Sequence, residues 1–129
     1  MLETSERPWG KWEDLLHDPD QPYRVKKITV NPGGKLSIQY HFKRSEVWTI
    51  IEGEGKAFVS NMPFEINNAD LKISEYNIKV GSVVKVPLQH IHSVEVPEDA
   101  KEPLVFIEVQ IGLSTEDDFV RLEDRYGRA

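Results

Sequence analysis

The chain has 129 residues, a formal net charge of −6 and no cysteine. This length fits one domain over residues 1–129 that can bury a core without disulfides, and the lack of cysteine excludes thiolate ligands and thiol catalysis. The negative charge argues against a nucleic-acid-binding protein, and no apolar run is long enough to span a membrane, so we expect a soluble cytoplasmic protein.

Short segments rich in β-branched and aromatic residues recur along the chain, separated by glycine, proline or asparagine. Helical signals are limited to one or two turns at 12–18 and to 114–127, where Ser and Thr precede acidic residues as at a helix N-terminus. In chain order, strands are predicted at residues 23–30, 35–41, 46–51, 56–60, 82–87, 92–96 and 103–111. The pattern predicts an all-β sandwich or barrel with short helical turns near both ends.

Two neighbouring predicted strands carry three potential metal ligands, Gln39, His41 and Glu46. If residues 35–41 and 46–51 form a hairpin, His41 lies opposite Glu46 across the ladder. Residues two apart in a strand share a face, and so do residues directly opposed on paired strands. We therefore expect the three side chains to lie together on the inner face, where burial is costly unless they bind a metal or form hydrogen bonds.

A fourth candidate ligand comes from the segment PLQHIHSVEV at 87–96, which contains His90 and His92. We expect only one of these two histidines to face inward. Nitrogen and oxygen donors without thiolate suit Zn, Mn, Co, Ni or Fe, and three or four protein ligands leave room for a substrate. From the side-chain pattern alone, ordinary strand surface is the alternative to a metal site.

The spacing of these residues resembles a known family pattern. The first cupin motif is matched by Gly33, Gln39, His41, Glu46 and Gly53, and the second by Gly81, Pro87 and His92. Over nearly the whole chain the sequence is similar to the type II phosphomannose isomerases, the domain found at the C-terminus of bifunctional mannose-1-phosphate guanylyltransferase/mannose-6-phosphate isomerase. This closer similarity is carried by RPWG at 7–10, the triplet Arg44, Glu46 and Trp48, PLVFIEVQIG at 103–112, and the tail EDDFVRLEDRYGR at 116–128.

The resemblance implies a cupin double-stranded β-helix, which is a jelly-roll barrel. It also implies one divalent metal ion held by Gln39, His41, Glu46 and His92, with His90 pointing elsewhere. The implied activity is metal-dependent aldose–ketose isomerisation of a sugar phosphate in carbohydrate metabolism, with mannose 6-phosphate and fructose 6-phosphate as the first candidates.

Such a reaction moves a proton between C1 and C2 of the sugar, so it needs a base within hydrogen-bond reach and cations that hold the phosphate. Arg44 lies beside the ligands, and its forked guanidinium suits phosphate, which makes it a candidate catalytic and substrate-binding residue. Arg125 and Arg128 are further phosphate-binding candidates. His90 and Lys85 are the candidates for the base.

Two other functions fit the same residues. A non-catalytic cupin that binds a sugar or sugar phosphate is favoured by Phe42, Lys43 and Val47, which stand where the family has further histidines. A different metal cupin, such as an oxygenase, is disfavoured by Gln39 in a ligand position. In each case we expect a small-molecule ligand and a homodimer.

Overall fold

The computed structural model describes residues 2–65, 69–112 and 120–123. Every secondary-structure element within these ranges is a β-strand. They are β1 (Thr4–Arg7), β2 (Gly10–His17), β3 (Tyr23–Val30), β4 (Ile38–Tyr40), β5 (Arg44–Glu52), β6 (Gly55–Pro63), β7 (Ile73–Ile78), β8 (Val83–Val86), β9 (His90–Glu95), β10 (Leu104–Gly112) and β11 (Val120–Glu123). No helix in the described ranges is long and apolar enough to cross a membrane.

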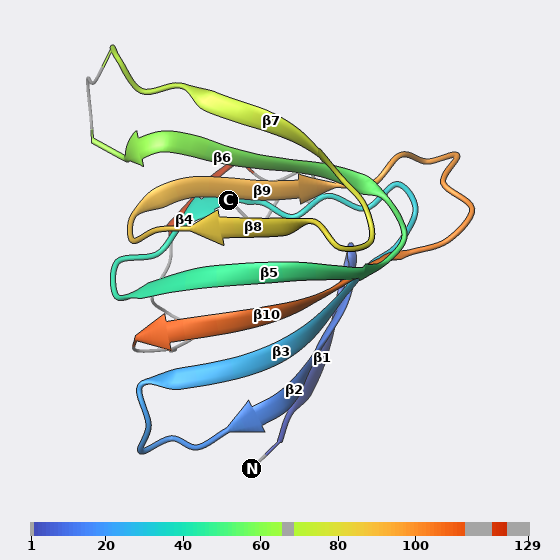
Figure 1. The fold of residues 1–129 in the computed structure, drawn as a ribbon, viewed down its shortest axis with the longest axis horizontal. Coiled ribbons are helices and arrows are strands. Elements are labelled where there is room, and N and C mark those ends of the chain that lie inside the picture. The colour runs from blue at the N-terminus through green and yellow to red at the C-terminus, as the bar shows by residue number, and fades with distance from the viewer. Residues whose placement is uncertain (1, 66–68, 113–119, 124–129) are drawn as a thin grey trace.

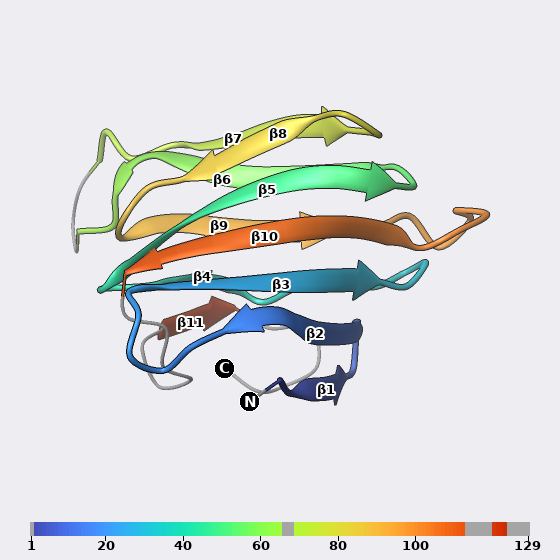
Figure 2. The same cartoon turned by 60° about the horizontal axis from the view of Figure 1, so that its bottom comes forward.

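The strands form two antiparallel sheets that lie one over the other (Figure 1). The six-stranded sheet has the order β1-β2-β3-β10-β5-β8, and the five-stranded sheet has the order β11-β4-β9-β6-β7. Figure 2 shows β5, β10 and β3 passing in front of β6, β9 and β4. The predicted all-β jelly-roll architecture is confirmed.

The buried interior between the sheets changes character along the strands. Near the turn from β5 to β6 the buried side chains are apolar; they include Val30, Ile50, Val94, Val96, Leu104 and Phe106. Toward the opposite ends of the same strands the buried side chains are polar; they include Lys26, Glu46, His92, Glu108 and Gln110. The period of two in each strand turns both sets inward, so the sheets enclose an apolar core at one end and a polar cavity at the other.

The helical turn predicted at 12–18 is wrong, because this segment belongs to β2. Its side chains alternate as in a strand: Trp12 and Asp14 are buried, and Glu13 between them is half-buried. Two hydrogen bonds of 2.7 and 2.8 Å from Arg24 fix Asp14 to the neighbouring strand β3. The helix predicted at 114–127 lies largely outside the described residues, and its described part is the strand β11.

The hairpin predicted between residues 35–41 and 46–51 is also wrong. Strand β4 pairs with β9 and β11 in one sheet, whereas β5 pairs with β10 and β8 in the other. The intervening loop therefore carries the chain between sheets instead of reversing it within one ladder. Because both strands face the same interior, side chains from the two segments can still meet there.

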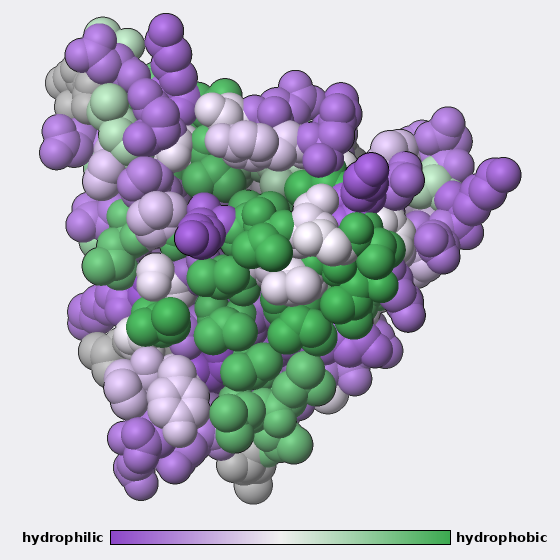
Figure 3. Space-filling model, viewed as in Figure 1, coloured by the Kyte–Doolittle hydropathy of each residue, from purple (hydrophilic) through white to green (hydrophobic). Residues whose placement is uncertain are grey.

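The outer face of the six-stranded sheet carries an apolar strip at its centre (Figure 3). Ile107 and Val109 of β10 are half-buried there, and Ile111 is 54% exposed. Val109 pairs with Val25 of β3 and Val47 of β5, so the strip continues across three strands. Apolar patches of this kind are found at protein interfaces, and the expected homodimer stays a prediction.

Replacing Gly53 with alanine is expected to destabilise the fold more than replacing Gly81. Both glycines have a positive φ, +77° and +92°, so alanine is strained at either position. A Cβ at Gly53 would lie 2.3 Å from the carbonyl oxygen of Pro103, whereas a Cβ at Gly81 would have nothing within 4 Å. We expect Gly81→Ala to cost about 1 kcal/mol in unfolding free energy and Gly53→Ala about 3 kcal/mol. Urea unfolding measures both, and equal losses would contradict the packing argument.

Candidate metal centre

The metal centre predicted from the sequence is assembled from three strand regions in two sheets. His41 follows β4 and His92 belongs to β9, both in the five-stranded sheet, while Glu46 projects from β5 in the other sheet. All three side chains are buried, with exposed fractions of 4%, 2% and 2% for His41, Glu46 and His92. The centre therefore lies between the sheets, at the polar end of the interior.

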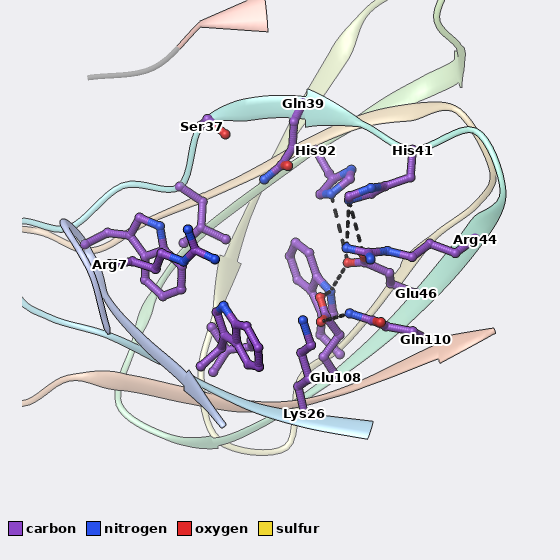
Figure 4. A pocket seen from close by; sticks show the side chains of 15 residues that line it. Arg7, Lys26, Ser37, Gln39, His41, Arg44, Glu46, His92, Glu108 and Gln110 are labelled. Atoms are coloured by element: carbon purple, nitrogen blue, oxygen red, sulfur yellow. Dashed lines mark hydrogen bonds and ion pairs between the residues drawn. The ribbon is translucent and has the colours of Figure 1, made fainter. Parts of the chain in front are cut away.

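The donor atoms of these three residues converge on one point (Figure 4). His41 Nε2 lies 3.3 Å from Glu46 Oε2, and His92 Nε2 lies 3.9 Å from Glu46 Oε1. One donor atom from each residue lies within 4.8 Å of the others, and this is the only such group of histidine and carboxylate residues in the described part of the chain. Donors this close, buried together, have the arrangement expected for a metal site.

The hydrogen bonds around the two imidazoles leave an Nε2 lone pair on each. Nδ1 of His92 lies 3.1 Å from the backbone carbonyl oxygen of His90, so Nδ1 carries the proton and donates it. Nη2 of Arg44 lies 3.2 Å from Nε2 of His41, and a guanidinium can only donate, so this Nε2 accepts. The lone pair of His92 Nε2 is therefore available to a metal, whereas a metal at His41 Nε2 would replace the hydrogen bond from Arg44.

Glu46 supplies the negative charge of the candidate centre. Burial by itself would raise the pKa of Glu46, but the hydrogen bond shared with Glu108 and the neighbouring cationic groups, Arg44 among them, hold that pKa well below its ordinary value. Glu46 is therefore a carboxylate. Burial lowers the pKa of His92, which keeps its imidazole neutral and able to bind a metal.

Gln39 faces the same cavity, as predicted. It lies beside His92 in the ladder between β4 and β9, and its amide points into the cavity in Figure 4. Its carbonyl oxygen would complete a set of two imidazole nitrogens, one carboxylate and one amide oxygen. Those donors fit a divalent first-row metal, and the assignment of all four residues as ligands stays a prediction.

The other predicted site residues are distributed differently. Arg44 lines the cavity, and its Nε donates to Glu46 Oε2 at 3.1 Å. Lys85 is exposed on β8 and lines a separate groove on the outside, because alternation in that strand buries Val84 and Val86 instead. Arg125 and Arg128 lie outside the described residues.

His90 does not line the cavity, although it is only two residues before His92. Strict alternation would put both side chains on one face, but the register between β6 and β9 shifts between the pairs Val59–His92 and Pro63–His90. At this irregularity Nδ1 of His90 lies 2.8 Å from the carbonyl oxygen of Ser60. The bulge therefore explains why only one of the two histidines reaches the centre.

Sequence reasoning missed a second polar group in the cavity, on β10. The indole N–H of Trp48 donates to both Glu46 and Glu108, at 3.0 and 3.1 Å, and Gln110 donates to the other oxygen of Glu108 at 2.8 Å. Burial, followed by the nearby charge of Glu46, raises the pKa of Glu108 to about 8. The signal that could have found Glu108 and Gln110 is their even spacing from Phe106, which marks the inward face of β10.

The cavity as a whole extends well beyond the metal donors. The centre of a water-sized sphere can reach about 100 Å³ inside it, and the cavity continues into an open mouth. Its lining residues come from both sheets and are Arg7, Trp9, Trp12, Lys26, Ile28, Leu36, Ser37, Gln39, His41, Arg44, Glu46, Trp48, His92, Glu108 and Gln110. An organic ligand bound next to the candidate metal centre would therefore extend into this open mouth.

Two facing antiparallel sheets with histidine and carboxylate donors between them define this protein as a cupin. Solved structures with the same fold include the capsular polysaccharide assembling protein CapF from Staphylococcus aureus, with a TM-score of 0.75 and 20% identity over 96% of this chain and 35% of that one. Another is an oxalate decarboxylase from Lactobacillus farciminis, with a TM-score of 0.73 and 22% identity over 94% of this chain and 33% of that one.

Residues 1–124 match the protein family described as Mannose-6-phosphate isomerase C-terminal, and the chain belongs to this family. Its similar relatives include the mannose-1-phosphate guanylyltransferase ManC of Salmonella typhimurium, 39% identical over 123 residues that cover 95% of this chain and 22% of that protein. The chain thus spans about a fifth of the length of the curated relatives it matches.

Proposed function

We propose that this chain is a metal-dependent aldose–ketose isomerase that acts on a sugar phosphate, with mannose 6-phosphate and fructose 6-phosphate as the first pair to test. The observation that carries the proposal is the buried convergence of His41, Glu46 and His92 in a polar cavity that opens to solvent. Membership of a family named for mannose-6-phosphate isomerase supports the reaction and substrate class.

In this proposal Gln39, His41, Glu46 and His92 hold one divalent cation. When bound, that cation supplies Lewis-acid polarisation of the sugar oxygens. Arg44 contacts Nε2 of His41 and Oε2 of Glu46, so the cation would take the place of its hydrogen bond to His41. Its guanidinium also lines the space in which the sugar would bind, so loss of Arg44 would affect both the donors and the substrate.

Proton transfer between C1 and C2 requires an acid–base group that faces the cavity without being a metal ligand. We assign this role to Glu108, because Trp48 and Gln110 each hold one of its carboxyl oxygens and so fix its orientation. Neither His90 nor Lys85 lines the cavity, and the proposal gives them no part in the reaction.

A coupled isomerase assay with mannose 6-phosphate tests the proposal. The protein is stripped of metal and supplied with Zn, Mn, Co or Ni, beside the variants His41→Ala and Glu108→Gln. We expect turnover only with metal, its loss in His41→Ala, and in Glu108→Gln a kcat lower by about 10²-fold or more with metal content unchanged. Metal binding without turnover of any hexose phosphate would overturn the isomerase proposal and leave a sugar-binding metal cupin.

The non-catalytic alternative receives little support from the positions that suggested it. Phe42 is 47% exposed, Lys43 is exposed, and Val47 lies in the outer apolar strip. None of the three lines the cavity. Histidines at those positions would not be ligands in this geometry, so their replacement removes no donor from the centre.

A further inference from the structure

The part of the cavity away from the metal donors is cationic and aromatic. Arg7, at the end of the edge strand β1, points into the cavity from the side opposite His41 and Arg44 (Figure 4). Trp9 and Trp12 line the same region and are both 7% exposed. None of these three residues is among the proposed metal ligands.

Lys26 adds a second positive charge to the cavity wall, between this region and Glu108 (Figure 4). Its side chain projects inward from β3, it is only 5% exposed, and its Nζ lies 3.8 Å from the centre of the Trp12 ring. Its charge also acts on Glu108, whose pKa it lowers against the effect of burial. Lys26 therefore places a positive charge on the cavity wall between the Trp12 ring and Glu108.

The chemistry of the proposed substrate requires an anion site that is separated from the metal donors. In a hexose 6-phosphate the reacting carbons C1 and C2 are separated from the phosphate by the rest of the carbon chain. If C1 and C2 lie at the metal donors, the phosphate must lie at the other end of the cavity. Arg44 contacts His41 and Glu46 at the metal end, whereas Arg7 is the arginine that lines the opposite end among the described residues.

We infer that Arg7 is the phosphate-binding residue of this cavity and that Lys26, beside Trp12, is the second cation of the same anion subsite. The inference rests on the proposed function for the orientation of the sugar. The forked guanidinium of Arg7 suits two phosphate oxygens, while Lys26 contributes a point charge. The edge hairpin of β1 and β2 would then determine that the substrate is phosphorylated.

Calorimetric titration of metal-free protein with sorbitol 6-phosphate tests this subsite without requiring turnover, because this sugar alcohol has no carbonyl group to isomerise. Sorbitol and inorganic phosphate are titrated in parallel. Arg7→Gln and Lys26→Gln are compared with Lys27→Gln, a matched control whose residue follows Lys26 on the same strand and lies outside the cavity lining. Melting temperatures establish that each variant is folded. If the buried substitution Lys26→Gln prevents folding, Arg7→Gln on the edge strand β1 still tests the subsite.

We expect Arg7→Gln to weaken sorbitol 6-phosphate binding by about ten-fold or more, Lys26→Gln to weaken it several-fold, and Lys27→Gln to match the wild type. Unchanged affinity in Arg7→Gln, or a wild type that does not prefer sorbitol 6-phosphate to sorbitol, would overturn the inference. Arg7-dependent phosphate binding in a protein without isomerase activity would keep the subsite and remove the isomerase. Turnover of mannose 6-phosphate by Arg7→Gln with an unchanged KM would keep the isomerase and remove the phosphate subsite.

Discussion

Replacing His92 with alanine is expected to lower the affinity for divalent metal by about 100-fold or more, whereas replacing His90 leaves it near the wild-type value. The imidazole of His92 is buried with its Nε2 facing Glu46, so its loss removes one of the four proposed ligands. His90 contributes only its backbone carbonyl to the centre, through the hydrogen bond from His92 Nδ1, and alanine retains that carbonyl. Loss of a ligand exceeds the 10- to 100-fold effects typical of residues that only orient ligands.

The two histidine variants are a matched pair, because they remove the same side chain two residues apart in one strand. Metal content after dialysis and calorimetric titration with Zn or Mn give the affinities, and the isomerase assay gives the activities. If His90→Ala lost metal as completely as His92→Ala, the ligand set proposed here would be incorrect.

Replacing Trp48 with alanine is expected to cost about 3–5 kcal/mol of unfolding free energy, and replacing it with phenylalanine about 1–3 kcal/mol. Trp48 is 1% exposed and packs against Phe106, with ring centroids 5.0 Å apart, so alanine leaves a large cavity in the core. Phenylalanine retains most of the ring but removes the N–H that donates to Glu46 and Glu108. Two buried carboxyl groups then lose a shared hydrogen-bond donor.

Urea unfolding of metal-free protein measures both losses on the same scale. The difference between Trp48→Ala and Trp48→Phe reports the packing of the ring, and the loss in Trp48→Phe reports the indole N–H. A phenylalanine variant as stable as the wild type would show that the indole N–H does not stabilise the two carboxyl groups.

Most of the strands could be predicted because the alternation of apolar and polar residues can be read from the sequence of each strand by itself. The pairing of those strands could not, since four residues between two strands are compatible with a hairpin and equally with a crossing between sheets. His41 and Glu46 converge, and Gln39 lines the same cavity, although the predicted hairpin is wrong. The inner faces of β4 and β5 enclose one interior even though the two strands belong to different sheets.

The missed residues have a different cause. Lys26, Glu108 and Gln110 lie in segments that read as ordinary strands, and charged or amide side chains in such strands are expected to face solvent. Only Phe106 contradicts that expectation, because it faces inward and lies two residues before Glu108. That Phe106 faces inward is known only from the structure. Arg125 and Arg128 lie outside the described residues and stay predictions.

Strand β10 has a consequence for folding. Its second half is inverted in hydropathy, with Glu108 and Gln110 inside and Val109 in the outer strip, while Leu104 and Phe106 in its first half are buried conventionally. A shift by one residue would exchange the two faces, and in the second half hydrophobic burial would favour that exchange. In the first half both faces are apolar, because Val105 is buried as well as Leu104 and Phe106. The second half of the strand is therefore locally frustrated, and the polar cavity exists only in the register that turns Glu108 and Gln110 inward.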